Sequence, residues 1–190
     1  MEQYEVETIE YRGHEIKVYQ DPDAESPREW DNLGKMVCFH RRYALGDEHD
    51  LTPDELIEII NRKGTVALPL FLLDHSGLWM RTHNFSDVDP GQWDSGQVGY
   101  IYASRKMILK EYGRKRLSRQ LVERIKRVLL SEVEAYNQYL TGEVYGYTIT
   151  YYGEVVDSCY GFFGDPNDYM IPECKDVIDH KMGEMSKNPS

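Results

Sequence analysis

The sequence lacks the patterns by which many enzymes and metal proteins are identified. Its three cysteines, Cys38, Cys159 and Cys174, are widely spaced and odd in number, so no pair has the C-x-x-C spacing of a metal or redox site. Neither an H-E-x-x-H zinc motif nor a G-x-x-x-x-G-K-[ST] phosphate loop occurs. We therefore expect three reduced thiols, no bound metal ion and no cofactor.

Long apolar runs are also missing. No stretch approaches the roughly 20 apolar residues that a membrane helix needs. The first residues, MEQYEVETIEYRG, are acidic and lack the basic and apolar regions of a signal peptide. These absences predict a protein without membrane contact that stays in the cytoplasm of the cell that makes it.

What is present is the composition of a folded protein. Apolar residues make up 41% of the 190 residues and aromatic residues 12%, which is enough to bury a core. We expect one α+β domain over residues 1–190, with residues 183–190 as a frayed tail.

Hydrophobic periodicity predicts the order of the elements. Period-two patterns predict strands within residues 4–19, 35–43, 65–83, 96–103 and 143–164. Helical spacing predicts helices over residues 53–63, 105–113, about 115–140 and 173–182. Since strands and helices do not alternate as βαβ units, we expect an α+β fold with a mostly antiparallel sheet and a long amphipathic helix packed on one face.

Two local signals are specific. Thr52-Pro53-Asp54-Glu55 has the pattern of a capping box with proline in the first helical turn. Tyr152-Gly153 suits a two-residue hairpin turn. If Tyr151 pairs with Glu154, regular alternation would place an aromatic wall on one face of the hairpin, made by Tyr145, Tyr147, Ile149, Val156 and Tyr160.

The net charge of −11 is unevenly distributed. Residues 1–59 hold 16 acidic against 6 basic residues, and residues 132–179 hold 10 against one. Residues 105–127 hold 10 basic against 2 acidic residues. Such density can neutralise successive phosphates, with Tyr112 stacking on a base. The predicted partner- or nucleic-acid-binding residues are Arg105, Lys106, Tyr112, Arg114, Lys115, Arg116, Arg119, Lys126 and Arg127.

Two other interpretations of this basic segment stay open. It can be a solvated helix face that balances an acidic body by internal attraction, or it can contact an acidic protein partner. The acidic body itself can imitate a phosphate backbone and occupy the nucleic-acid groove of another protein, because complementary charge speeds encounter and selects partners.

A Trp-Asp pair occurs twice, at residues 30–31 and 93–94, each shortly before a predicted strand. The simpler interpretation is a turn, with the tryptophan lying over the neighbouring core. Alternatively, Asp31 and Asp94 meet and, with His75 and His83, bind a divalent cation for hydrolysis. Cys159 lies in an acidic predicted strand, so we expect it to be packed rather than nucleophilic.

The stretches WDNLGKMVCFHRRYALGD, WDSGQVGYIYAS and GEVYGYTITYYGEVVDSCYGFFG resemble a group of small proteins encoded by bacteriophages and integrated elements. The resemblance covers most of residues 8–165. It implies a non-enzymatic accessory protein that works by binding inside a bacterial host cell. The implied partner is a host defence protein or ribonucleoprotein nuclease complex, inhibited in the manner of anti-CRISPR or anti-restriction proteins. The alternatives are a small metal-dependent hydrolase or nuclease, and a structural or regulatory phage protein.

Overall fold

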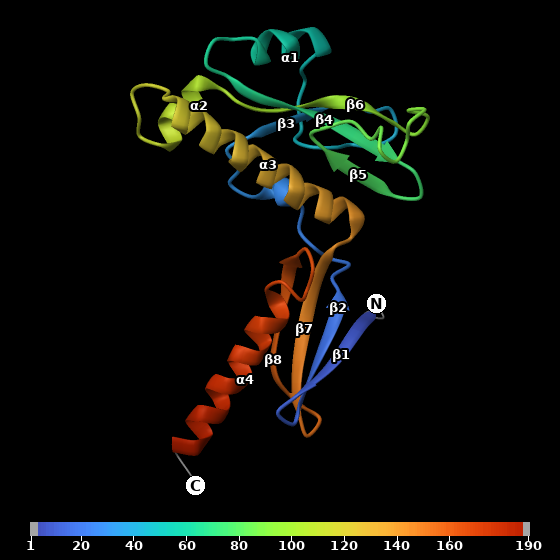
Figure 1. The fold of residues 1–190 in the computed structure, drawn as a ribbon, viewed down its shortest axis with the longest axis vertical. Helices are drawn as coiled ribbons and strands as arrows, with labels where there is room; N and C mark the ends of the chain where they lie inside the picture. The colour runs from blue at the N-terminus through green and yellow to red at the C-terminus, as the bar shows by residue number, and fades with distance from the viewer. Residues whose placement is uncertain (1–3, 188–190) are drawn as a thin grey trace. The chain divides into compact units, whose positions relative to one another are not determined.

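The computed structural model describes residues 4–187 and contains two antiparallel four-stranded sheets (Figure 1). Helix α3 packs on one sheet, so the predicted α+β class with a long helix on a sheet face is confirmed. The chain divides into two compact units. Unit 1 comprises Met1–Glu25 with Gly142–Ser190, and unit 2 comprises Ser26–Thr141. The single domain expected over residues 1–190 stays a prediction.

Unit 1 is a sheet of order β1-β2-β7-β8 covered by one helix. Its strands are β1 (Glu5–Tyr11), β2 (His14–Gln20), β7 (Val144–Tyr151) and β8 (Glu154–Phe163), and its helix is α4 (Met170–Lys187). Because alternate residues of each strand point to one face, a single apolar layer forms beneath α4. The buried members of that layer are Ile16, Val18, Tyr147, Ile149, Met170, Ile171, Cys174 and Ile178.

Helix α4 is longer than predicted. It includes residues 183–187, which were expected to belong to the frayed tail. The remaining tail residues, 188–190, lie outside the described residues.

The hairpin turn at Tyr152-Gly153 is confirmed, with φ angles of 49° and 84°. The predicted aromatic wall is wrong at Tyr160. The register shifts twice, between Tyr145 and Gly146 and between Ile149 and Thr150, so regular alternation fails along β8. Tyr160 therefore pairs with Gly146 and stays 38% exposed.

Cys159 lies on the same irregular strand. It is exposed, so the expectation that it would be packed is wrong. Phe162, which was not predicted, joins the core of unit 1.

Unit 2 is a sheet of order β3-β6-β4-β5 with helices on both faces (Figure 1). Its strands are β3 (Lys35–Cys38), β4 (Val66–Asp74), β5 (Leu78–Arg81) and β6 (Ser95–Ala103). Helix α3 (Arg119–Thr141) buries Ile125, Leu129, Val133 and Tyr136 against one face. Helix α1 (Pro53–Ile60) packs Leu56 against Val37 and Tyr102 on the other.

Side-chain caps determine where the helices of unit 2 begin. The predicted capping box is confirmed: the Thr52 amide donates to the Glu55 carboxylate at 2.8 Å, and the Glu55 amide donates to the Thr52 hydroxyl at 3.3 Å. Ser104 caps α2 (Arg105–Glu111). The Leu121 amide donates to the Ser118 hydroxyl at 3.1 Å, so α3 begins at Arg119 and not near residue 115 as predicted.

The charge of the protein separates by unit. Unit 1 holds 17 acidic and 5 basic residues, a formal net charge of −12. Unit 2 holds 16 acidic and 17 basic residues, a formal net charge of +1. Outside the basic segment 105–127, unit 2 holds 14 acidic and 7 basic residues, a formal net charge of −7, so the +8 of the segment is nearly balanced within its own unit.

Candidate functional site

All nine residues predicted to bind a partner lie in unit 2, on α2, on the loop that follows it and on the first turns of α3. Tyr112 and Lys126 are half-buried and the other seven are exposed. Lys126 forms an ion pair with Glu123 at 3.1 Å, so its charge is partly matched within the helix.

Part of this segment surrounds a hollow of about 430 Å³ at the start of α3. Its lining residues are Tyr112, Arg114, Arg116, Ser118, Gln120, Leu121 and Arg124. The Arg124 guanidinium lies over the Tyr112 ring, 5.0 Å from its centroid. This cation–π contact holds Arg124 at the rim of the hollow.

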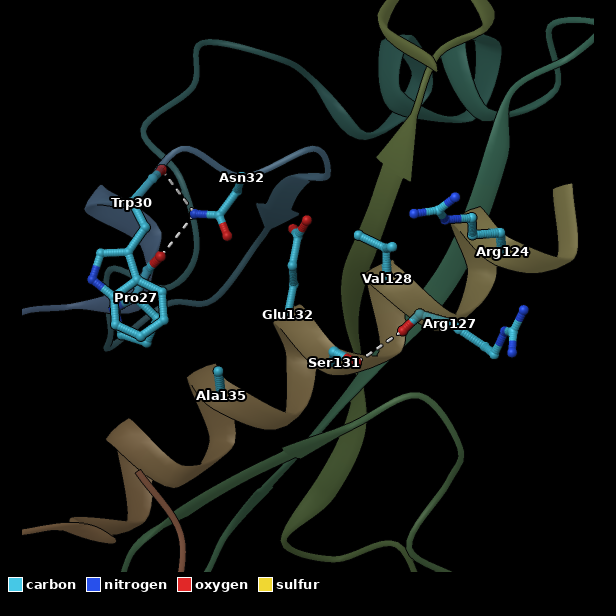
Figure 2. A pocket seen from close by; sticks show the side chains of 9 residues that line it. All are labelled: Pro27, Trp30, Asn32, Arg124, Arg127, Val128, Ser131, Glu132 and Ala135. Carbon is cyan, nitrogen blue, oxygen red and sulfur yellow. Dashed lines mark hydrogen bonds between the residues drawn. The ribbon is translucent and has the colours of Figure 1, made fainter. Parts of the chain in front are cut away.

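A second hollow of about 710 Å³ lies farther along α3. Figure 2 shows Trp30 and Pro27 at one end of it and Arg124 and Arg127 at the other. The α3 residues between these ends are Val128, Ser131, Glu132 and Ala135, and Asn32 completes the lining.

The two hollows are neighbours because both are lined by Arg124. Their α3 residues recur every three or four positions, from Gln120 to Ala135, and therefore occupy one side of the helix. We call this pair of hollows the basic groove. Four arginines line it: Arg114, Arg116, Arg124 and Arg127.

The wall opposite α3 is a short loop built on the 3-10 helix η1 (Pro27–Glu29). The Asn32 side-chain amide donates to the Pro27 carbonyl at 2.7 Å and to the Trp30 carbonyl at 3.0 Å (Figure 2). These bonds fix the backbone on both sides of Trp30, whose side chain is 45% exposed at the groove.

An ion-pair network attaches this loop to α3. The Arg28 guanidinium donates to the Asp47 carboxylate at 2.8 and 3.1 Å, to the Glu132 carboxylate at 3.2 Å and to the Gly34 carbonyl at 2.7 Å. The Arg28 side chain is only 5% exposed. Burial alone would lower the pKa of Arg28, but its bonds to Asp47 and Glu132 raise it, so the guanidinium stays charged.

Glu132 lines the groove and is paired with the buried Arg28, which it shares with Asp47. Its carboxylate faces Arg28 and accepts the amides of Leu33 at 2.9 Å and Gly34 at 3.1 Å. Since one guanidinium faces two carboxylates, the Arg28–Asp47–Glu132 network keeps a formal charge of −1 beside the arginines of the groove.

The Trp-Asp pairs form turns, as the simpler interpretation predicts, but the tryptophans do not cover a core. Trp30 is 45% exposed and Trp93 90% exposed. Asp89, rather than the residue after Trp93, holds the second turn: its carboxylate accepts the amides of Trp93 at 3.2 Å and Asp94 at 3.1 Å. The first turn depends on Asn32.

Only some of the residues predicted for the alternative hydrolase lie close together. His75 Nδ1 lies 2.9 Å from the Asp94 carboxylate. His83 lines a hollow beside α3 that does not include Asp94, and Asp31 lines neither of the hollows that contain those two residues. Among residues 4–187 no group of three or more His, Cys, Asp or Glu side chains could hold a metal ion.

All three cysteines are free thiols, as expected. Burial raises the pKa of Cys38 and that of Cys174 to about 12 each. These two thiols therefore stay protonated at neutral pH and serve as packing groups.

Comparison with protein-family models, with curated proteins and with solved structures finds no significant match to this chain. The resemblance to phage-encoded proteins stays a prediction. Among the described helices, none combines the length and apolar character needed to span a bilayer.

The groove contains functional candidates that sequence reasoning missed. Arg124 belongs to the same basic stretch and stands three positions before Arg127, so helical spacing alone indicates that the two share a side of α3. Trp30 carries no such signal, since it lies far from α3 in sequence and reaches the groove only through the fold. Of the predicted residues, Arg105, Lys106, Lys115, Arg119 and Lys126 do not line the groove.

Proposed function

We propose that the protein is a non-enzymatic accessory protein that binds nucleic acid through the basic groove of unit 2. One observation carries the proposal: four arginines from the α2–α3 segment line two hollows that share Arg124, and the acidic side chain in their lining, Glu132, is paired with the buried Arg28. Arginine at this density matches successive phosphates, and its planar guanidinium binds them through two hydrogen bonds.

The groove supports nucleic acid over an acidic protein partner because its arginines stand in a concave surface beside aromatic rings. Tyr112 lies under Arg124 in one hollow, and Trp30 borders the other. Cationic grooves with interleaved aromatic side chains are typical of proteins that follow a nucleic-acid backbone. An acidic protein surface would need only the charges.

The phage resemblance suggests the biological setting of this binding. In that setting the protein inhibits a host defence nuclease by occupying nucleic acid held in the nuclease complex. The acidic unit 1, at −12, would then face the basic nucleic-acid groove of the same complex.

A pull-down from bacterial lysate tests this proposal. The immobilised protein should recover a ribonucleoprotein nuclease, and nuclease treatment of the lysate should abolish the recovery. A bait with Arg114→Gln, Arg116→Gln and Arg124→Gln is the control and should recover neither. Recovery of bulk nucleic acid alone would contradict the inhibitor role, and recovery of no nucleic acid would contradict the binding function.

A further inference from the structure

The two edges of the sheet in unit 1 are protected to different degrees. An edge strand leaves a row of backbone amides and carbonyls without a neighbouring strand, and proteins block such rows with bulges, lysine or proline. At one edge, the pairing of β8 with β7 skips Val156 and Gly161, which interrupts the row. The Lys181 ammonium also donates to the Val156 carbonyl at 2.6 Å. This edge is therefore poorly suited to accept a further strand.

Strand β1 forms the other edge and lacks these devices over most of its length (Figure 1). Among the described strands it pairs only with β2. Its register shifts once, at Val6, and residues Glu7–Tyr11 then pair without interruption. These five residues include neither lysine nor proline, and Glu7, Thr8 and Glu10 are exposed. Glu7–Tyr11 is thus a regular edge that a further strand can extend.

Two hydrogen bonds show which way the residues of β2 point. In an antiparallel strand the backbone groups of successive residues point alternately to the neighbours on its two sides. The Gln20 amide donates to the Tyr4 carbonyl at 3.1 Å, just before β1, and the Asp21 amide donates to the Val144 carbonyl at 2.8 Å, on β7. Since β2 pairs with β7 without a shift, its even-numbered residues bond to β1 and its odd-numbered residues bond to β7.

The same alternation identifies the open backbone groups of β1. Ile9 pairs with the even-numbered Ile16, so the amide and carbonyl of Ile9 bond to β2. Thr8 and Glu10 flank Ile9, and their amides and carbonyls therefore point away from the sheet. An added strand can form hydrogen bonds with all four of these groups.

The side chains along this edge indicate the charge of the added strand. Glu10 lies directly opposite Glu15 on β2, and like charges in such a pair repel each other. Glu15 has Lys17 at 3.8 Å, but among the described residues no lysine or arginine forms an ion pair with Glu10. A lysine or arginine on the added strand would face Glu10 and offset the repulsion.

We propose that β1 accepts an extended segment rich in lysine and arginine, from a partner protein, as a fifth strand of the sheet in unit 1. The open backbone groups of Thr8 and Glu10 hold the segment. Glu7 and Glu10, which lie on opposite faces of β1, select basic side chains on both faces of the segment. A second copy of β1 suits the edge less well, because it would bring another unit of net charge −12 beside the first. This binding is separate from the groove of unit 2 and does not depend on it.

The test uses the full-length protein and a labelled peptide in which lysine alternates with valine, titrated by fluorescence anisotropy. The same peptide with N-methyl groups on its central amides keeps its charge and loses its hydrogen-bond donors, so it should bind at least about 10-fold more weakly. A peptide in which glutamate alternates with valine should not bind.

Two variants and a control locate the binding on β1. Thr8→Pro removes an outward amide and leaves the bonds to β2 in place, and it should weaken binding of the lysine peptide about 10-fold. Glu10→Gln should weaken it about threefold. Glu154→Gln, which removes the same charge from the exposed start of β8, should leave it unchanged.

Strand addition is overturned if the N-methylated peptide binds as tightly as the unmodified one, or if Glu10→Gln and Glu154→Gln have equal effects, since overall charge would then explain the binding. A dissociation constant above about 1 mM for the lysine peptide at low salt would also overturn it. So would a wild-type dimer that Thr8→Pro dissociates, because a second copy would then occupy the edge. Circular dichroism should show that Thr8→Pro is folded; if it is not, the two lysine peptides and the glutamate variants decide the question.

Discussion

Replacing Glu132 with alanine should lower the free energy of unfolding by about 3–5 kcal/mol, the usual cost of removing one partner from a buried ion pair. In this variant the Arg28 side chain, which is only 5% exposed, keeps Asp47 as its one carboxylate partner of the two. It also removes the acceptor of the Leu33 and Gly34 amides. Urea denaturation of the full-length protein, followed by circular dichroism and tryptophan fluorescence, measures the loss.

Glu134→Ala is the matched control. Glu134 is exposed on the same helix and its removal changes the charge by the same amount. We expect a change within about 0.5 kcal/mol. Equal losses in the two variants would show that the network around Arg28 does not stabilise unit 2.

The triple variant Arg114→Gln, Arg116→Gln and Arg124→Gln should lose about 100-fold in affinity for a single strand at moderate salt. Each arginine–phosphate contact that is lost should also reduce the magnitude of the slope of log affinity against log salt by about 0.7. The slope of the triple variant should therefore be smaller in magnitude by about 2. All three side chains are exposed, and the fold should be unaffected. Anisotropy titrations at several salt concentrations give both quantities.

The control for this variant removes three charges from the same segment outside the groove. Arg105, Lys106 and Lys110 are exposed on α2 and line neither hollow. Their replacement by glutamine should cost far less affinity. Equal losses in the two triple variants would mean that the segment acts by its overall charge and that the groove has no particular role.

The elements of this fold could be predicted from the sequence where the signals are local. The Thr52–Glu55 box, the Tyr152-Gly153 turn and the apolar stripe of α3 each depend on residues a few positions apart. The bulges of β8 could not be predicted, because a shift in register depends on what the strand packs against and not on its own alternation. Tyr160 and Cys159 were therefore placed wrongly.

The candidate site likewise has residues that could be predicted from the sequence and one that could not. Charge density indicated Arg114, Arg116 and Arg127, and Tyr112 was indicated as the aromatic residue within that stretch. The fold places all four along one groove. Trp30 was missed because the contact that brings its loop to the groove, between Arg28 and Glu132, joins residues 104 positions apart. A pair at that separation leaves no periodic trace in a single sequence.

The most direct test of the central claim is the salt dependence of single-strand binding by the wild-type protein. If the four arginines of the groove each contact a phosphate, the slope of log affinity against log salt should be near −3, and binding should be readily measurable at about 50 mM salt. Binding weaker than about 10⁻⁴ M at that salt, or affinity that does not change with salt, would contradict the account.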